Sequence, residues 1–272
     1  MPIPERGEFF LRDSGGAGPA VLLLHGWLFS SDLNWLAVYE PLRRAGHRVL
    51  AVDHRGHGRG LRSPEPFRLE DCAADAAAVV RAVGAGPVIV IGYSMGGAVA
   101  QLMARDHRET VAGLVLCATA ADWRNLYLRV LWRTMSLLRL GLGLFPTAYW
   151  ESLLAIGRVE RGDRRSWAAA ELSRGSSRDL AEAGREMSRY DARPWIAGLR
   201  DVPRAVVITT RDRQILPRKQ RELARRLGAE AFEVDGDHMV VGYAPERFNP
   251  ALLRALAHVT RATTGESRAL AG

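Results

Sequence analysis

The feature that most constrains the fold is a serine flanked by glycines, which lies between two segments of opposite character. The run Gly92-Tyr93-Ser94-Met95-Gly96-Gly97 follows the apolar segment Pro87–Ile91 and precedes the helix-favouring segment Ala98–Ala104. A sharp strand-to-helix turn leaves no room for a Cβ two residues before or after its central residue, and glycine meets that requirement. Because such a turn presents its central side chain to substrate, the pattern predicts that Ser94 is a nucleophile.

The rest of the chain predicts strands that alternate with helices. Apolar runs occupy Val21–Leu24, Arg48–Val52, Pro87–Ile91, Val111–Cys117 and Ala205–Ile208. Runs that are apolar at every position are typical of parallel strands covered on both faces. Between them, Trp35–Arg44 and Leu69–Val83 have the spacing of helices. We therefore predict an α/β fold with a doubly wound, mainly parallel sheet.

This alternation breaks between Ala121 and Ala192. The segment contains no convincing strand and carries four of the tryptophans, Trp123, Trp132, Trp150 and Trp167. A chain of 272 residues is long for one minimal domain and short for two independent ones. We predict a core domain formed by residues 1–120 and 193–272, with residues 121–192 inserted as a helical cap.

In the first part of the expected cap, the spacing of apolar residues predicts one amphipathic helix over Asn125–Arg139. Helical spacing places Asn125, Arg129, Arg133 and Ser136 on one side, and Val130, Leu131, Met135 and Leu138 on the other. Three interpretations remain open: the apolar side packs on neighbouring helices, it lines an acyl pocket, or the basic side docks on a membrane surface. The uncharged stretch Leu140–Trp150 is too short to span a bilayer, so we predict no stable membrane insertion.

A nucleophilic serine needs a base within hydrogen-bond reach and a carboxylate that holds this base in the right tautomer. The best candidate for the base is His238, in a glycine-containing loop just past a short strand-like run. The other histidines are less suitable: His107 and His258 lie on expected helices, His47 precedes a strand, and His54 and His57 follow Asp53. His238 is therefore the predicted general base.

The predicted carboxylate is Asp212, which follows the Ala205–Ile208 strand and precedes a helix that begins at a proline. Sites in open α/β sheets assemble at the carboxyl ends of the strands. Asp122 follows the Val111–Cys117 strand in the same sense and remains an alternative. Asp237 is a weaker candidate, because adjacent side chains in an extended loop point apart.

Acyl transfer also needs donors for the oxyanion that forms in the transition state. The backbone N–H of Met95 lies at the first turn of a helix, where amides have no intrahelical acceptor. The backbone N–H of Trp27 follows His25-Gly26 at the end of the first apolar strand. We predict that these two amides form the oxyanion hole and that His25 holds the loop by hydrogen bonding.

Taken together, these motifs resemble the α/β-hydrolase superfamily over nearly the whole chain. They are His25-Gly26-Trp27, Asp53-His54-Arg55-Gly56-His57-Gly58, the motif around Ser94, Asp212 with Pro217, and Gly236-Asp237-His238. The order Ser, Asp, His is the order of that superfamily. The resemblance implies a mostly parallel eight-stranded sheet, a cap over Ser94 and no cofactor. It also implies that Ser94 attacks an acyl carbonyl, with His238 as base and then acid, and with Asp212 orienting His238.

Two positions depart from the pattern of this superfamily. Gly60 stands where a serine often follows the Asp53–Gly58 motif, so the shape of this loop is expected to differ. Asp237 adds a charge directly before His238, where small or neutral residues are common. Neither change removes a catalytic group.

Composition excludes several other classes of protein. The net charge is +8 and Lys219 is the only lysine, so the excess is arginine. The arginines are scattered rather than clustered with aromatic residues, which favours the codon usage of a GC-rich genome over nucleic-acid binding. Cys72 and Cys117 suggest neither a disulfide framework nor a metal site. The N-terminus lacks the features of a signal peptide, so a cytoplasmic enzyme is expected.

The predicted reaction is hydrolysis of a carboxylic ester of a largely apolar small molecule through an acyl-enzyme. The cap favours an apolar substrate, and Trp123, Met135, Trp150 and Met239 are its expected pocket residues. By resemblance, serine rather than aspartate as nucleophile argues against epoxide hydrolases and haloalkane dehalogenases. Lactonase, thioesterase, perhydrolase and carbon–carbon bond hydrolase activities use the same residues and remain open. A small-molecule receptor and an arginine-rich interaction protein are the alternatives outside catalysis.

Overall fold

The computed structural model describes residues 1–123, 126–156 and 162–265 and is built around a seven-stranded sheet. The strand order is β3-β5-β4-β6-β7-β8-β9, and every neighbouring pair is parallel except β3 with β5. The strands are β3 (Leu11–Asp13), β4 (Ala20–Leu24), β5 (Arg48–Val52), β6 (Val88–Tyr93), β7 (Val111–Cys117), β8 (Arg204–Thr209) and β9 (Glu230–Val234). The mostly parallel sheet and all five predicted strands are confirmed.

The number of strands in this sheet differs from the expected eight. In the described part of the chain, β1 (Pro2–Ile3) and β2 (Gly7–Glu8) pair only with each other. The tight turn between them, with Glu5 at φ 63° and Gly7 at φ 110°, folds the chain back on itself before it reaches the main sheet. The N-terminal strands therefore form a separate hairpin.

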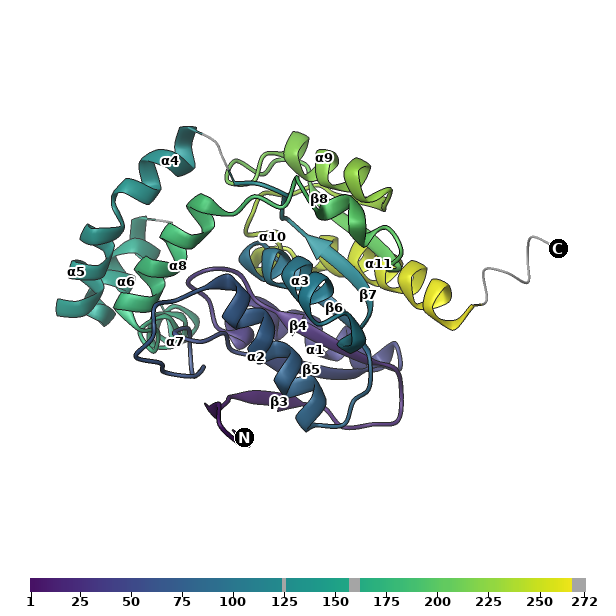
Figure 1. Ribbon diagram of the computed structural model, residues 1–272. Coiled ribbons are helices and arrows are strands. Elements are labelled where there is room, and N and C mark those ends of the chain that lie inside the picture. Colours follow the sequence, from purple (N-terminus) through teal and green to yellow (C-terminus); the bar gives the residue numbers. More distant parts are fainter. Residues whose placement is uncertain (124–125, 157–161, 266–272) are drawn as a thin grey trace.

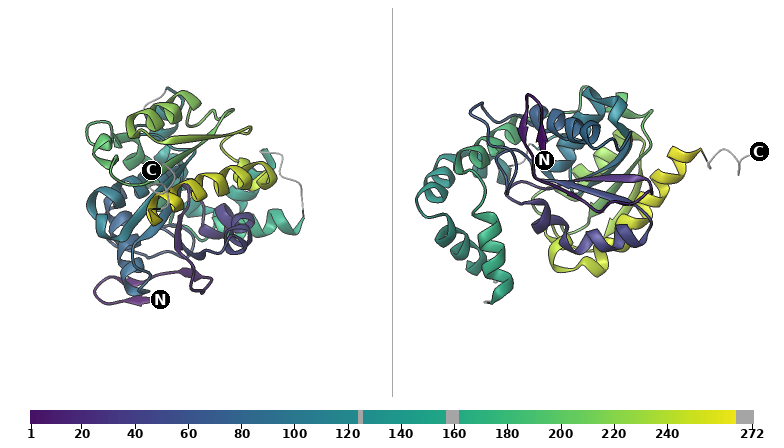
Figure 2. Two further views of the ribbon diagram at one scale, coloured as in Figure 1. Left: turned by 90° about the vertical axis from the view of Figure 1, so that its right-hand side faces the viewer. Right: turned by 90° about the horizontal axis from the view of Figure 1, so that it is seen from below.

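Helices cover both faces of the sheet, which gives the three-layer arrangement seen in Figures 1 and 2. Alternate side chains of β4 point to opposite faces: Leu22 and Leu24 pack toward one group of helices, and Val21 and Leu23 toward the other. The first group is α2 (Leu69–Ala82), α3 (Met95–Asp106) and α9 (Pro217–Leu227), and the second is α1 (Ser31–Arg44) and α11 (Pro245–Thr264). Short helices complete the core: η1 (Arg108–Thr110), η2 (Ile196–Leu199) and α10 (Val240–Tyr243).

Five helices between β7 and β8 form a separate group, which we call the helical lobe. They are α4 (Leu126–Arg133), α5 (Met135–Leu144), α6 (Pro146–Ile156), α7 (Asp163–Leu172) and α8 (Ser177–Arg189). Figure 1 shows this lobe on one side of the core, with α5 at its outer edge. The described residues between β7 and β8 contain no strand beyond one isolated bridge between Asp122 and Asp191.

The single helix predicted over Asn125–Arg139 is wrong in two respects. The chain forms two helices that are separated at Thr134, where ψ is 6° and the backbone leaves the α-helical range. Val130, expected on the packed side, is 59% exposed. Asn125 lies outside the described residues.

Helix α8 is one of the helices in the lobe that are fastened to loops of the core. Three hydrogen bonds do this: Trp27 Nε1–H to Leu180 O at 2.8 Å, Phe67 N–H to Glu182 Oε2 at 2.9 Å, and Ser176 N–H to Gly56 O at 2.8 Å. Helix α5 packs in turn on α8 and α6. Helix α7 is bonded to the core as well, because the Ser30 hydroxyl donates to Glu171 Oε2 at 3.2 Å and Arg59 lies 3.4 Å from the same carboxylate. The lobe is therefore held through α7 and α8.

Two further expectations concern cysteines and membrane spans. Cys72 on α2 and Cys117 on β7 are buried free thiols. Across the described ranges, none of the helices combines the length and apolar character that crossing a bilayer requires.

Candidate active site

Ser94 alone makes the turn from β6 into α3. Its backbone has φ 54° and ψ −117°, a conformation that a residue with a Cβ rarely adopts. A Cβ on Gly92 would lie 2.4 Å from the Gly96 carbonyl oxygen, and a Cβ on Gly96 would lie 2.1 Å from the Leu24 carbonyl oxygen. Both glycines of the motif are therefore sterically required, and the strained turn holds the hydroxyl of Ser94 at the end of the sheet.

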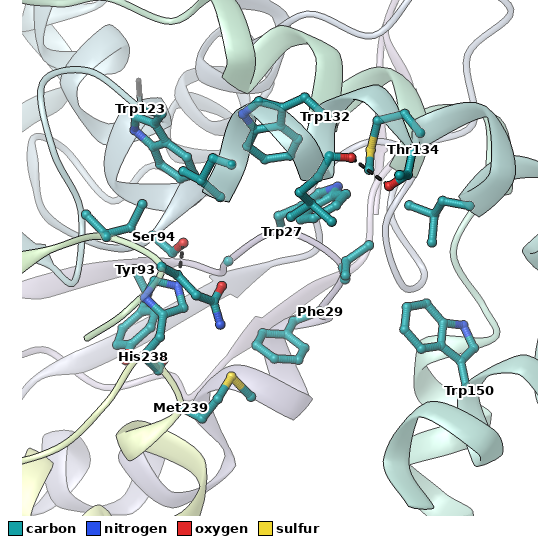
Figure 3. A pocket seen from close by; sticks show the side chains of 18 of the residues that line it. Trp27, Phe29, Tyr93, Ser94, Trp123, Trp132, Thr134, Trp150, His238 and Met239 are labelled. Carbon is teal, nitrogen blue, oxygen red and sulfur yellow. Dashed lines mark hydrogen bonds between the residues drawn. The ribbon is translucent and has the colours of Figure 1, made fainter. Parts of the chain in front are cut away.

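Three side chains from separate loops meet at this turn, and Figure 3 shows two of them, Ser94 and His238. His238 Nε2 lies 2.9 Å from Ser94 Oγ, and His238 Nδ1 lies 2.7 Å from Asp212 Oδ2. Asp212 follows β8 and His238 follows β9, so both stand at the carboxyl ends of neighbouring strands. The fold thus brings together the three residues that the sequence singled out, although Ser94 and His238 are 144 positions apart.

The Asp212 carboxylate is buried and surrounded by donors. Its Oδ1 accepts the backbone N–H groups of Gln214 at 2.8 Å and Ile215 at 2.9 Å. Its Oδ2 accepts the Thr209 hydroxyl at 2.8 Å and the Gln220 side-chain amide at 3.2 Å, besides His238. These bonds offset the desolvation of the carboxylate and fix the oxygen that faces the imidazole.

The loop that carries His238 is fixed by Tyr93, the residue before the serine. The Tyr93 hydroxyl donates to the His238 carbonyl oxygen at 2.8 Å, and the two rings lie 5.7 Å apart. Burial raises the pKa of Tyr93 well above its ordinary value, so the hydroxyl remains a donor. Asp237 is exposed and accepts from the backbone N–H of Met239 at 2.8 Å, so its side chain turns away from the site.

The alternative acid, Asp122, is engaged elsewhere. It accepts a hydrogen bond from Lys219 Nζ at 2.5 Å and lies 3.9 Å from the Arg193 guanidinium. This position at the base of the helical lobe gives Asp122 an ion-pairing role. The carboxylate that faces the ring of His238 is that of Asp212.

The two predicted oxyanion donors come from the helix that follows Ser94 and from the loop that runs beside it. Met95 is the first residue of α3, where the amide has no acceptor within the helix. The loop of Trp27 runs so close to the serine that a Cβ on Gly26 would be only 3.4 Å from the Ser94 Cβ. The Gly26 N–H is held by Asn34 Oδ1 at 2.9 Å. Within the described ranges, neither the Trp27 nor the Met95 amide donates to another protein group.

His25 holds this loop through its ring, as predicted. Its Nε2 accepts the backbone N–H of His54 at 2.9 Å, and its Nδ1 donates to the Gly26 carbonyl oxygen at 2.8 Å. The rings of His25, His54 and His57 form a buried cluster with centroids 4.5 to 6.5 Å apart and with tilted or edge-on planes. Burial lowers the pKa of all three, and that of His57 to about 3, so the cluster is neutral near pH 7.

Gly60, the departure from the family pattern, sits where no side chain fits. A Cβ there would lie 2.1 Å from the His54 carbonyl oxygen and 2.6 Å from that of Asp53. Arg62 donates to the carbonyl oxygens of Gly60 and Gly58 at 2.5 and 2.7 Å. The absence of a side chain at Gly60 therefore lets the loop pack directly on the backbone of Asp53 and His54, and the hydrogen bonds of Arg62 hold it there.

A cavity of about 510 Å³ opens above Ser94 and His238 (Figure 3). All four predicted pocket residues line it: Trp123, Met135, Trp150 and Met239. The sequence reasoning missed further lining residues, among them the side chains of Trp27, Phe29, Trp132, Leu137, Tyr149 and Gln214. The i, i+3 spacing of Trp132 and Met135 was a signal for one of these. The walls are mostly apolar, so the cavity suits an apolar ligand.

In the part of the chain that the structure describes, no group of three His, Cys, Asp or Glu side chains is arranged to hold a metal ion. The reacting groups that are available are a hydroxyl, an imidazole, a carboxylate and two backbone amides.

Known proteins share this architecture. The sequence model of the alpha/beta hydrolase fold family matches residues 19–243. A non-heme haloperoxidase of Rhodococcus erythropolis is 41% identical over 110 residues, which are 40% of this chain and 39% of that protein. A bifunctional esterase/perhydrolase of Acinetobacter calcoaceticus is 37% identical over 111 residues, 40% of each protein. The chain thus matches about two-fifths of the length of these curated relatives.

The likeness in structure extends further than the likeness in sequence. A thermophilic esterase from Thermogutta terrifontis superimposes with a TM-score of 0.77 at 24% identity, covering 95% of this chain and 97% of that one. At this identity the match shows the fold. The family model covers most of the chain, and the fold agrees with that of the esterase. The protein therefore belongs to the alpha/beta hydrolase fold family.

Proposed function

We propose that this protein is a serine hydrolase that cleaves a carboxylic ester of a largely apolar small molecule. The observation that carries this proposal is the continuous hydrogen-bonded series from Asp212 through His238 to Ser94, at the floor of an apolar cavity. A serine that is hydrogen-bonded to an imidazole held by a carboxylate is the arrangement that acyl transfer requires.

In the first half of the reaction, His238 Nε2 takes the proton of Ser94 Oγ while this oxygen attacks the acyl carbon. The negative charge that forms on the carbonyl oxygen is stabilised by the backbone N–H groups of Trp27 and Met95. The proton then passes from His238 to the leaving alcohol, and the acyl group remains on Ser94. Asp212 keeps the proton on Nδ1 and stabilises the imidazolium.

In the second half, His238 removes a proton from water, which attacks the acyl-enzyme carbonyl. The same two amides stabilise the second oxyanion, and His238 returns its proton to Ser94 as the acid leaves. The proton transfers use the pairs Ser94–His238 and His238–Asp212, which already lie within hydrogen-bond reach. Ester hydrolysis therefore needs nothing beyond these residues and water.

The polar side chains of the cavity indicate which type of bond is cleaved. Apart from Ser94 and His238, its polar side chains are few, and Gln214 and Thr134 are among them. Carbon–carbon bond hydrolysis needs further polar groups that ketonise the substrate, whereas an ester does not. Lactones, thioesters and peracids require the same groups as an ester. The printed names of the relatives, an esterase/perhydrolase and a haloperoxidase, accord with this range.

The test is turnover of p-nitrophenyl esters of increasing acyl length by the purified protein and by the Ser94→Ala variant. We expect multiple turnovers by the wild type, with a chain-length preference set by the 510 Å³ cavity, and none by the variant. A burst of one equivalent without further turnover would contradict the proposal and indicate a ligand-binding protein. Turnover that persists in Ser94→Ala would contradict the assignment of the nucleophile.

A further inference from the structure

Helix α5 is apolar on two opposite faces, although only one of them packs. Met135 and Leu142 on the inward face are buried against α8 and α6. The outward face carries Leu137, Leu140 and Leu144, which are 69%, 57% and 61% exposed, and Phe145, 68% exposed, follows directly. We call these four residues the leucine face. An ordinary surface helix is polar on its outward side, so this face requires a partner of its own.

The leucine face is continuous with the mouth of the catalytic cavity. Leu137 belongs to the leucine face and also lines the cavity. Met239, beside His238, lines the cavity as well and is 40% exposed. The opening is thus bordered by exposed apolar side chains from the lobe and from the core. Contiguous exposed apolar surface of this kind marks an interaction site.

The stretch of sequence that contains this face is basic, although Arg139 lies near enough to Glu182 on α8 to interact with it electrostatically. Between Asp122 and Glu151 the sequence contains four arginines and no acidic residue: Arg124, Arg129, Arg133 and Arg139. The side chains of Arg133, at the end of α4, and Arg139, on α5, are exposed. An exposed apolar face accompanied by arginines is typical of helices that lie in the surface of an anionic bilayer.

A second copy of the chain is a poorer partner for the same surface. Pairing two leucine faces would bring two sets of arginines together, and like charges across an interface are repelled. Anionic lipid head groups instead attract the arginines, while the acyl region receives the leucines. The charge pattern therefore favours a bilayer over self-association.

We propose that the leucine face, together with Arg133 and Arg139, docks on the surface of a bilayer that contains anionic phospholipid. Docking in this orientation places the mouth of the cavity against the bilayer, so that an ester dissolved in the membrane can reach Ser94. The docking stands without the proposed function, whereas the delivery of an ester rests on it.

The first experiment measures flotation of the 272-residue protein with vesicles of phosphatidylcholine, with and without phosphatidylglycerol. We expect binding to the vesicles that contain phosphatidylglycerol, weakened by salt because screening reduces the attraction. The variant Leu140→Ser/Leu144→Ser/Phe145→Ser should need at least about tenfold more lipid for half-maximal binding. The variant Arg133→Gln/Arg139→Gln should lose the preference for phosphatidylglycerol. Leu36→Ser, at a leucine on α1 that is 60% exposed, is the matched control and should bind as the wild type does.

The second experiment compares two substrates. Leu140, Leu144 and Phe145 do not line the cavity, so the triple variant should turn over a short water-soluble ester at the wild-type rate. Its turnover of a long-chain ester embedded in the vesicles should fall about tenfold, in step with lipid binding.

The outcomes separate the two proposals. Wild-type protein that ignores phosphatidylglycerol vesicles, or serine variants that bind them equally well, would overturn the docking. A dimer in sedimentation that the triple variant dissolves would also overturn it, because the face would then join two copies. Vesicle binding without turnover of any ester would support the docking and refute the proposed hydrolysis.

Discussion

The floor and the roof of the cavity are built from different interactions. The floor, around Ser94 and Asp212, is held by short hydrogen bonds between buried groups and by glycines that leave no space for a Cβ. The roof, in the helical lobe, consists of apolar side chains on helices that reach the core through α7 and α8. Polar bonds with fixed geometry position reacting atoms within tenths of an ångström, whereas apolar packing sets only volume and shape.

This contrast predicts where substitutions are tolerated. A change in the floor breaks several bonds at once or forces backbone to move. A change in the outer roof removes some contact area and leaves the reacting groups in place. Variants at the floor should therefore alter kcat or folding stability, and variants at the roof should alter the choice of substrate.

The largest effect is expected when the floor loses Ser94 or His238. Ser94→Ala and His238→Ala should each lower kcat for a p-nitrophenyl ester by about 10⁴-fold or more, and the double variant should be no worse than either one. The measurement is steady-state turnover, with circular dichroism to show that each variant is folded. Effects that multiply in the double variant would show that the two residues act independently.

Asp212→Asn should come next. Two backbone N–H groups hold the Oδ1 position, so the amide oxygen stays there and its NH2 group faces Nδ1, which favours the wrong tautomer of His238. The kcat should fall by up to about 10⁴-fold. Asp122→Asn is the matched control, because this aspartate pairs with Lys219 at the base of the lobe, and its kcat should stay within about threefold of the wild type. A greater loss in Asp122→Asn than in Asp212→Asn would reverse the assignment of the acid.

The third prediction concerns stability of the floor rather than chemistry. Gly60→Ala would press a Cβ against two backbone carbonyl oxygens, and the free energy of unfolding should fall by about 1–3 kcal/mol. Gly198→Ala, where nothing lies within 4 Å of an added Cβ, should change it by less than about 0.5 kcal/mol. Urea denaturation measures both. Equal stability of the two variants would show that the backbone around Gly60 can move to accommodate a Cβ at little cost in free energy.

Because the histidines beneath the floor are buried, we expect the folding stability of the protein to decrease in acid. The pKa of His57 is about 3 in the folded state and near 6.5 when unfolded, so between these values the unfolded state binds more protons. The free energy of unfolding should therefore decrease as pH falls through this range, by up to about 1.4 kcal/mol per pH unit for each histidine.

Urea denaturation between pH 7 and pH 4 measures this slope. His25 and His54 shift in the same direction and contribute to it. His57→Gln removes one titrating group, so its slope should be shallower than that of the wild type. An identical slope in the variant would show that His57 takes up a proton without unfolding.

The smallest effect is expected at the roof. Leu137→Ala removes a side chain that lines the cavity yet is 69% exposed, so stability should change by less than about 0.5 kcal/mol. The rate for a short acyl ester should be nearly unchanged, while kcat/KM for a long one should fall by less than about tenfold. An equal loss for all chain lengths would mean that the roof also positions the reacting atoms.

The floor was largely predictable from sequence, because its chemistry depends on residues in fixed local patterns. Gly92 and Gly96 are required by sterics that act over a few residues, and Asp212 and His238 stand directly after strands. The five buried strands are apolar at nearly every position. The edge strands β3 and β9 have no such signal, since most of their residues are at least partly exposed.

The roof was less predictable, because helix ends there depend on tertiary packing. Arg133, Thr134 and Met135 carry no proline or glycine, and the break at Thr134 has no local cause in the sequence. The pocket side chains of Trp27 and Phe29 come from a core loop and meet the lobe only after folding, as the 5.3 Å contact between Trp27 and Trp132 shows. Trp123, Met135, Trp150 and Met239 line the cavity, and their large apolar side chains were the sequence signal for it.

Trp27 belongs to the floor and the roof at once. Its peptide N–H is one of the two proposed oxyanion donors, and its indole N–H is bonded to the carbonyl oxygen of Leu180 on α8. When α8 shifts, either this bond breaks or the loop that bears the peptide N–H shifts with it. A bulky substrate that displaces the lobe would therefore change the rate of acyl transfer without touching Ser94, His238 or Asp212.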